Sequence, residues 1–254
     1  MRSSLADILV IISCIAVSVA LLYLLKRVWN PRSRSGHNDV IGTNVNVIGT
    51  TYAVLIAFML SNVWINFRAA ETNSEQESNC LVNLYRIAKN LPQPQRGRIE
   101  LYARQYALDA VNVEWQEMEN NRDMSRGITQ PFWDALAEVK PGSAAEQEGL
   151  SQSFNELREL TEHRRIRALQ SRSHLPPLLW AVLVVGAIVT ILSACLFGVE
   201  NFRLHMVQVS FLAFLLALVL VAIGDIDSPF TGPVRVTPDG FTYAVQTIDR
   251  EAGK

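Results

Sequence analysis

Long apolar blocks alternate with polar segments along this chain, and these blocks determine how it is organised. Each block is about 20 residues long, which is enough for a helix to cross a hydrocarbon layer of about 30 Å. They predict four transmembrane helices, at residues 5–25, 45–67, 175–198 and 205–224. The first block ends in Lys26–Arg27. It is also longer than the apolar region of a typical signal peptide, so we interpret it as a retained span.

The segments between the spans have a different composition. Residues 26–44 contain a proline, two glycines and several Ser and Asn, which predicts a linker. Residues 68–174 show helical periodicity without an alternating strand pattern, which predicts a helical extramembrane domain between spans two and three. Residues 225–254 are rich in Gly and Pro and predict an irregular tail with at most a short terminal helix. The expected fold class is all-α, a polytopic membrane protein.

The second apolar block, VNVIGTTYAVLIAFMLSNVWINFR, carries two patterned faces and no formal charge before its final arginine. Small residues recur at every fourth position on one face, a pattern that lets membrane helices approach closely. These helix-packing candidates are Gly49, Ala53, Ala57 and Ser61. The adjacent face is polar at both ends and apolar in the middle, and its pore-lining candidates are Thr50, Val54, Phe58 and Asn62. Two interpretations stay open, namely an ordinary packed membrane helix or a helix lining a pore with an apolar constriction.

Composition supports the membrane assignment and excludes several functional classes. The 254 residues are 49% hydrophobic and only 19% charged, and the mean hydropathy is +0.15, an apolar balance for a soluble protein. A net charge of −1 without a basic patch argues against binding to nucleic acid. No phosphate loop, zinc-binding His pair or nucleophile elbow occurs in the sequence. We therefore expect neither an enzyme nor a bound cofactor.

Charged and thiol side chains offer few candidates for a binding site. The three cysteines are scattered and show no disulfide or metal-binding spacing. Asp225 and Asp227 follow the fourth span and are weak calcium candidates, because hard cations prefer oxygen ligands. The alternative is that both are solvated or backbone-bonded turn residues. Two Asp are too few for a calcium site by themselves.

Two further sets of charged residues can each be interpreted in two ways. The arginines before the third span either attract anions into a vestibule or form a solvated helix face. They are Arg164, Arg165, Arg167 and Arg172. The acidic residues on the polar extension of the second span are either exposed or paired with those arginines. They are Glu71, Glu75 and Glu77.

Charge alone does not decide the orientation in the membrane. Lys- and Arg-rich loops tend to lie in the cytoplasm. The basic residues of the first linker favour a cytoplasmic linker, whereas the arginines before the third span favour a cytoplasmic helical domain. With four spans these two segments lie on opposite sides, so the two indications conflict.

Three stretches of the sequence together resemble a known family. They are TTYAVLIAFMLSNVWINFRAAETNSEQESNCLVNLYRIAKNLP, then IELYARQYALDAVNVEW, and finally DIDSPFTGPVRVTP after the last span. The chain is similar to the bacterial bestrophin-like proteins, also classed as the domain of unknown function DUF4239. The most specific part is the Asp-x-Pro-Phe-x-Gly element, formed here by Asp227, Pro229, Phe230 and Gly232.

The resemblance implies an assembly and an orientation. The more distant likeness to true bestrophins implies a pentameric anion channel with four spans, helical cytosolic parts and cytosolic termini. It makes Thr50, Val54 and Phe58 the candidates for an apolar neck, and it places residues 68–174 in the cytosol. The expected location is the bacterial inner membrane. The expected partners are the lipid bilayer, further copies of this chain, and inorganic ions, with anions implied by the likeness.

The expected function is a homo-oligomeric ion channel with the second span lining the pore. The rival is a non-conducting membrane scaffold or sensor whose helical extramembrane domain binds a partner. A small-solute transporter is a third possibility, but such proteins usually contain internal repeats with broken helices. We find no such repeat in the sequence.

Overall fold

The computed structural model describes residues 4–29, 34–120, 122 and 127–253, and its elements are helical throughout these ranges. Contacts divide the chain into two compact units. The membrane unit consists of Arg2–Ile65 and His174–Asp227, and the extramembrane unit contains Asn66–Ser173 and Ser228–Lys254. The predicted all-α fold class is confirmed.

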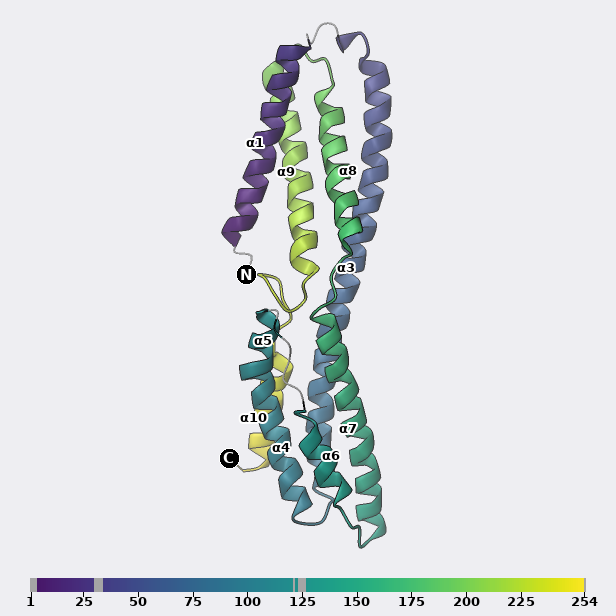
Figure 1. The fold of residues 1–254 in the computed structure, drawn as a ribbon, viewed down its shortest axis with the longest axis vertical. Helices are drawn as coiled ribbons and strands as arrows, with labels where there is room; N and C mark the ends of the chain where they lie inside the picture. Colours follow the sequence, from purple (N-terminus) through teal and green to yellow (C-terminus); the bar gives the residue numbers. More distant parts are fainter. Residues whose placement is uncertain (1–3, 30–33, 121, 123–126, 254) are drawn as a thin grey trace. The chain divides into compact units, whose positions relative to one another are not determined.

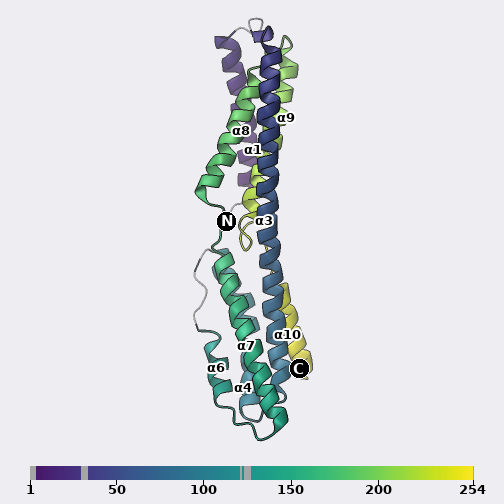
Figure 2. The ribbon, with the colours of Figure 1, turned by 90° about the vertical axis from the view of Figure 1, so that its right-hand side faces the viewer.

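The membrane unit contains α1 (Ser4–Val28), α8 (Pro177–Cys195), α9 (Phe202–Ile226) and the first part of α3 (Asn38–Ala88) (Figure 1). Among the described residues, four helices are long and apolar enough to cross a membrane, and they are these four. Helices α1 and α9 run side by side. Figure 2 shows α3 as one uninterrupted helix, which contributes residues to both units. The helix of the second span therefore continues beyond Arg68.

The first connection is shorter than the sequence predicts. Helix α3 begins at Asn38 rather than Val45, so part of the expected linker 26–44 is helical. The side chain of Asn38 donates to the carbonyl of Gly198 at 3.0 Å and accepts the Gly198 N–H at 2.9 Å. These hydrogen bonds hold the first turn against the α8–α9 connection, so tertiary contacts outweigh the low helix propensity of Gly42.

Helix α3 packs within the membrane unit through Tyr52 and Val63, which are buried. The hydroxyl of Tyr52 donates to the carbonyl of Leu183 on α8 at 2.6 Å. This bond satisfies the polar end of a buried aromatic ring. The ring lies against Gly186, where an added Cβ would meet ring carbons at 2.4 and 2.5 Å. The absent side chain of Gly186 therefore permits the approach of α3 to α8.

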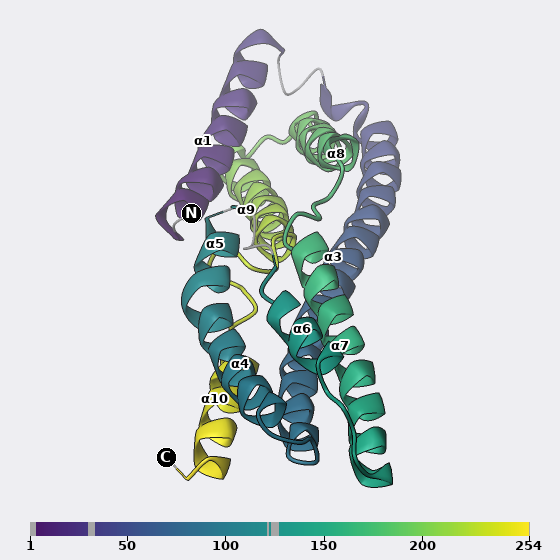
Figure 3. The ribbon, with the colours of Figure 1, turned by 60° about the horizontal axis from the view of Figure 1, so that its bottom comes forward.

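The extramembrane unit contains the rest of α3 and a set of shorter helices. These are α4 (Gln95–Asp109), the π-helical segment η1 (Ala110–Glu114), α5 (Trp115–Glu119), α6 (Gln130–Ala137), α7 (Ala144–Gln170) and α10 (Asp239–Glu251). Helix α4 lies beside α10 and α6, and α6 lies beside α7 (Figure 3). The predicted helical domain between spans two and three is confirmed.

The tail contains one terminal helix, α10, which spans 13 residues. Phe241, Ala244 and Ile248 lie on one face of α10 and are buried. The Phe241 ring packs 5.7 Å from Trp115 and 6.3 Å from Tyr106, measured between ring centroids. The sequence predicted at most a short terminal helix, and α10 occupies that place; the prolines before it do not interrupt it.

We expect Gly186→Ala to destabilise the membrane unit by about 1–3 kcal/mol, the usual cost of overpacking a filled core. The thermal unfolding midpoint of the purified protein in detergent measures this loss. Gly42→Ala is the matched control, because its Cβ would meet the Phe197 ring at an ordinary 3.8 Å. Equal midpoints for both variants would contradict the Tyr52–Gly186 contact.

Candidate functional site

The pore-lining candidates lie on an exposed face of α3. Val54 is 52% exposed and Phe58 is 70% exposed, and Thr50 and Asn62 are also exposed in the single chain. This face is distinct from the one that carries the buried Tyr52. The helices of its own chain therefore leave it available to lipid, to water or to another copy.

The helix-packing candidates are also turned away from the chain's own core. Ala53, Ala57 and Ser61 are exposed and Gly49 is half-buried. A Cβ added at Gly49 would have no atom within 4 Å. Close helix packing through this small-residue face is not made within one chain, and its use between copies stays a prediction.

The face of α3 that does pack within the chain was not predicted from the sequence. Tyr52 and Val63 are three helical turns apart and point to the same side. Tyr52 could have indicated this packed face, because a tyrosine in the middle of an apolar span needs a hydrogen-bond partner. Its partner on α8 lies 131 residues away, which no local pattern indicates.

Asp227 has a structural role at the end of α9. Both of its carboxylate oxygens accept the backbone N–H of Leu175, at 2.9 and 3.1 Å. This contact joins the end of α9 to the residues that precede α8. The structure therefore agrees with the backbone-bonded alternative for Asp227. Within the described part of the chain, Asp225 and Asp227 do not belong to a group of metal-ligating side chains.

Five side chains from α3, α4, η1 and α7 form a buried ionic network in the extramembrane unit. Arg167 is fully buried, and its Nε and Nη2 lie 2.7 and 2.8 Å from the two oxygens of Glu77. Its Nη2 also lies 2.7 Å from Glu114 Oε2. Tyr106 donates to Glu77 at 2.5 Å, and Arg164 pairs with the other oxygen of Glu114. The two arginines balance the two carboxylates.

The surroundings of the network reinforce these pairings. Burial by itself would lower the pKa of Arg167, but the carboxylates of Glu77 and Glu114 raise this pKa above its ordinary value. Burial, reinforced by the charge of Glu77, raises the pKa of Tyr106 well above its usual range, so its hydroxyl remains a donor. The Arg167 guanidinium also lies 5.1 Å from the centre of the Trp115 ring, a cation–π contact.

Glu114 reaches the network from the last position of the π-helical segment. A π-bulge adds a residue to one turn of an α-helix and so changes the direction of the side chains around it. Nothing in the sequence AVNVE signals this bulge. The pairing of Glu77 with an arginine of α7 was one of two open interpretations, and it is confirmed. Arg164 and Arg167 are neither a solvated face nor free to attract anions, because both are paired.

Comparison with known proteins identifies the family. A family profile described as "Bestrophin-like domain" matches residues 12–241, which is most of the chain. The chain belongs to the bestrophin-like family. The resemblance inferred from the sequence is thereby confirmed, and no curated protein sequence matches this bestrophin-like chain.

Solved structures share its fold. Two variants of a bacterial bestrophin homologue from Klebsiella pneumoniae are similar, at TM-scores of 0.67 and 0.66 and identities of 12% and 14%. Each alignment covers 96% of this chain and 99% of that chain. A structure described as a membrane protein aligns at TM-score 0.69 and 12% identity, over 96% of this chain and 98% of that chain. This chain is thus a multi-pass membrane protein with the fold of a bacterial bestrophin homologue.

We expect Arg167→Met to destabilise this bestrophin-like protein by about 3–5 kcal/mol, because it leaves two buried carboxylates without their shared partner. Denaturant unfolding of the full chain in detergent, followed by far-UV circular dichroism, measures the loss. The control is Arg165→Met on the same helix, whose pair with Glu162 is 62% and 50% exposed. Such a surface pair contributes little to stability, because solvent screens the two charges. Similar small losses in the two variants would contradict a stabilising role for the network.

Proposed function

We propose that this bestrophin-like protein assembles into a homopentameric anion channel of the bacterial inner membrane, with α3 lining the pore. One observation carries the proposal: the uncharged face of α3, polar at its ends and apolar in its middle, is exposed in the single chain. Phe58, in the part of α3 that belongs to the membrane unit, is 70% exposed. The anion preference rests on the likeness to bestrophins.

The two patterned faces of α3 suit a ring of copies. Successive residues of an α-helix are about 100° apart, because a turn contains 3.6 residues. If Val54 and Phe58 face a central axis, the small residues Ala53 and Ala57 lie about 100° around the helix, toward a neighbouring copy. Small residues on that side allow close helix contact. A ring of α3 helices would therefore use both faces at once.

The order of side chains along the proposed pore suits a hydrophobic gate. Val54 and Phe58 would form an apolar constriction, flanked by the polar side chains of Thr50 and Asn62. Water and ions leave a narrow apolar passage unless it widens, so such a ring gates by dewetting. No charged side chain stands on this face between Thr50 and Asn62.

A non-conducting scaffold or sensor is the alternative function. In that case the exposed face of α3 contacts lipid or another span, and the extramembrane unit binds a protein partner. Electron microscopy of the purified protein in nanodiscs separates the two functions. A ring of five copies with Val54 and Phe58 on its axis supports the channel. A monomer, a dimer or a ring with lipid on its axis contradicts it and favours the scaffold.

We expect Phe58→Ala to raise the single-channel conductance of the protein reconstituted in a planar bilayer, because a smaller side chain widens the apolar ring. Phe211→Ala is the matched control, since Phe211 on α9 is also 70% exposed and lies outside the proposed pore face. A salt gradient across the bilayer then tests the anion preference through the sign of the reversal potential. An unchanged current in Phe58→Ala would exclude this position as the gate.

A further inference from the structure

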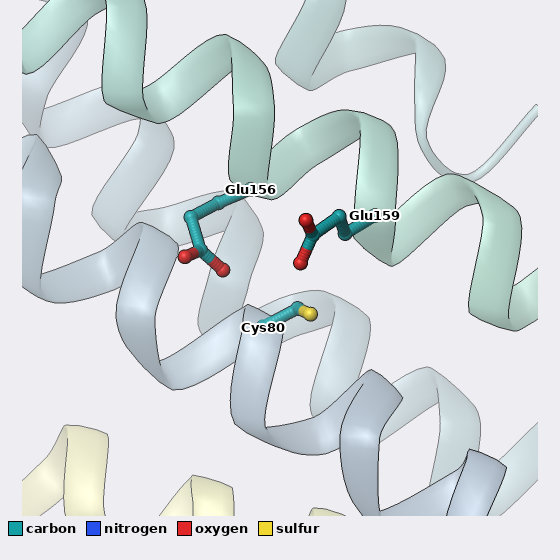
Figure 4. A group of neighbouring side chains, drawn as sticks. All are labelled: Cys80, Glu156 and Glu159. Carbon is teal, nitrogen blue, oxygen red and sulfur yellow. The ribbon is translucent and has the colours of Figure 1, made fainter.

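Three side chains with metal-ligating atoms meet between α3 and α7 in the extramembrane unit. They are Cys80, Glu156 and Glu159, and one ligand atom from each lies within 4.8 Å of the others. Figure 4 shows the thiol of Cys80 and the two carboxylates directed into the space between the two helices. Glu156 and Glu159 share one face of α7 because they are three residues apart. The cluster therefore joins two helices rather than lying along one.

The cluster lacks the positive charge that the buried carboxylates of this unit possess. Glu77 and Glu114 each pair with an arginine. Among the described residues, neither Glu156 nor Glu159 forms such an ion pair with Lys, Arg or His.

The polar atoms of the cluster are also incompletely satisfied. Glu156 interacts with the side chains of Asn83 and Cys80. Its Oε2, however, is buried and has no hydrogen-bond partner among the described residues. A buried acceptor without a partner is destabilising, because it has lost its hydrogen bonds to water. A cation between the helices would remove this destabilisation.

The pKa values of Glu156 and Cys80 are consistent with this lack of nearby positive charge. Burial, together with the nearby charge of Glu159, raises the pKa of the Glu156 carboxyl above its ordinary value. Cys80 lies in the extramembrane unit and is only 6% exposed. Burial and the neighbouring carboxylates raise the pKa of its thiol to about 12. Without a bound cation, Cys80 is therefore a protonated thiol at neutral pH.

We propose that Cys80, Glu156 and Glu159 bind a divalent transition-metal ion of the zinc class. Zinc is borderline-soft and accepts one thiolate together with carboxylate oxygens, whereas calcium and magnesium prefer oxygen ligands alone. Three protein ligands leave one position of a tetrahedral ion for water. On binding, the Cys80 thiol loses its proton to solvent and the sulfur bonds to the metal, so one proton is released per ion from this thiol.

A metal at this position would fix α7 to α3. Cys80 belongs to the same helix, α3, as Val54 and Phe58. Metal binding at this site does not, however, depend on ion conduction. A channel and a scaffold could hold it equally. The tests below therefore use the metal alone, with no measurement of current.

The first experiment is a Co²⁺ titration of the chelator-treated full chain in detergent. Cobalt stands in for zinc because it is visible spectroscopically. We expect one equivalent per chain and a near-ultraviolet sulfur-to-cobalt charge-transfer band that Zn²⁺ abolishes by competition. Cys80→Ser should lose this band. Cys195→Ser, which removes a buried thiol of the membrane unit, should keep it.

The second experiment measures Zn²⁺ affinity by competition with a chromophoric chelator. We expect Glu159→Gln to weaken binding by more than about tenfold, since even outer-shell partners of metal ligands contribute about 10- to 100-fold. Glu159 is exposed, so this variant should fold even if Cys80→Ser does not. Glu148→Gln, at another exposed position of α7, is the control and should bind as the wild type does.

Three outcomes would overturn the proposal. The first is an absence of saturable Zn²⁺ binding. The second is unchanged affinity in Glu159→Gln, which would mean an adventitious ion only. The third is displacement of Co²⁺ by Ca²⁺ at equal concentration, which would contradict the zinc class.

Discussion

Burial of Arg167 between two carboxylates is the interaction on which the extramembrane unit depends. The guanidinium is fully buried and joins Glu77 of α3 to Glu114 of the π-helical segment. Its face also lies 5.1 Å and 5.5 Å from the rings of Trp115 and Phe241, so α10 packs on the same group. Burying one charge is costly unless it is paired and hydrogen-bonded. The π-helical segment and the terminal helix thus both belong to the environment of one arginine.

The membrane unit is held by a different kind of contact. Its spans are apolar on nearly every side, so their association depends on shape rather than on withdrawal from water. The ring of Tyr52 against Gly186, with its hydroxyl on the carbonyl of Leu183, supplies both close packing and one hydrogen bond. This contact leaves the patterned faces of α3 outside the core of the chain. The same helix therefore contributes a packed face to its own chain and an exposed face to its surroundings.

The sequence predicted what depends on local composition and missed what depends on distant partners. Apolar runs identified the spans, and helical periodicity identified the extramembrane helices. The start of α3 at Asn38 depends on Gly198, and the order of α10 depends on buried contacts of Phe241. The proximity of Cys80 to Glu156 arises only when α3 packs on α7. The residue pattern identified the face that carries the pore-lining candidates. Whatever this face contacts lies outside the single chain, so neither the sequence nor the fold of one chain identifies it.

The continuity of α3 has a consequence for how this sequence can vary. Tyr52 and Phe58 lie on one uninterrupted helix, so the angle between the packed and the exposed side chain about its axis is set by the number of residues between them. Inserting or deleting one residue there would change that angle by about 100°. Natural insertions and deletions should therefore collect in the connections between helices, such as the one from α6 to α7. The number of residues from Tyr52 to Phe58 should stay fixed, while the identities of the intervening residues change.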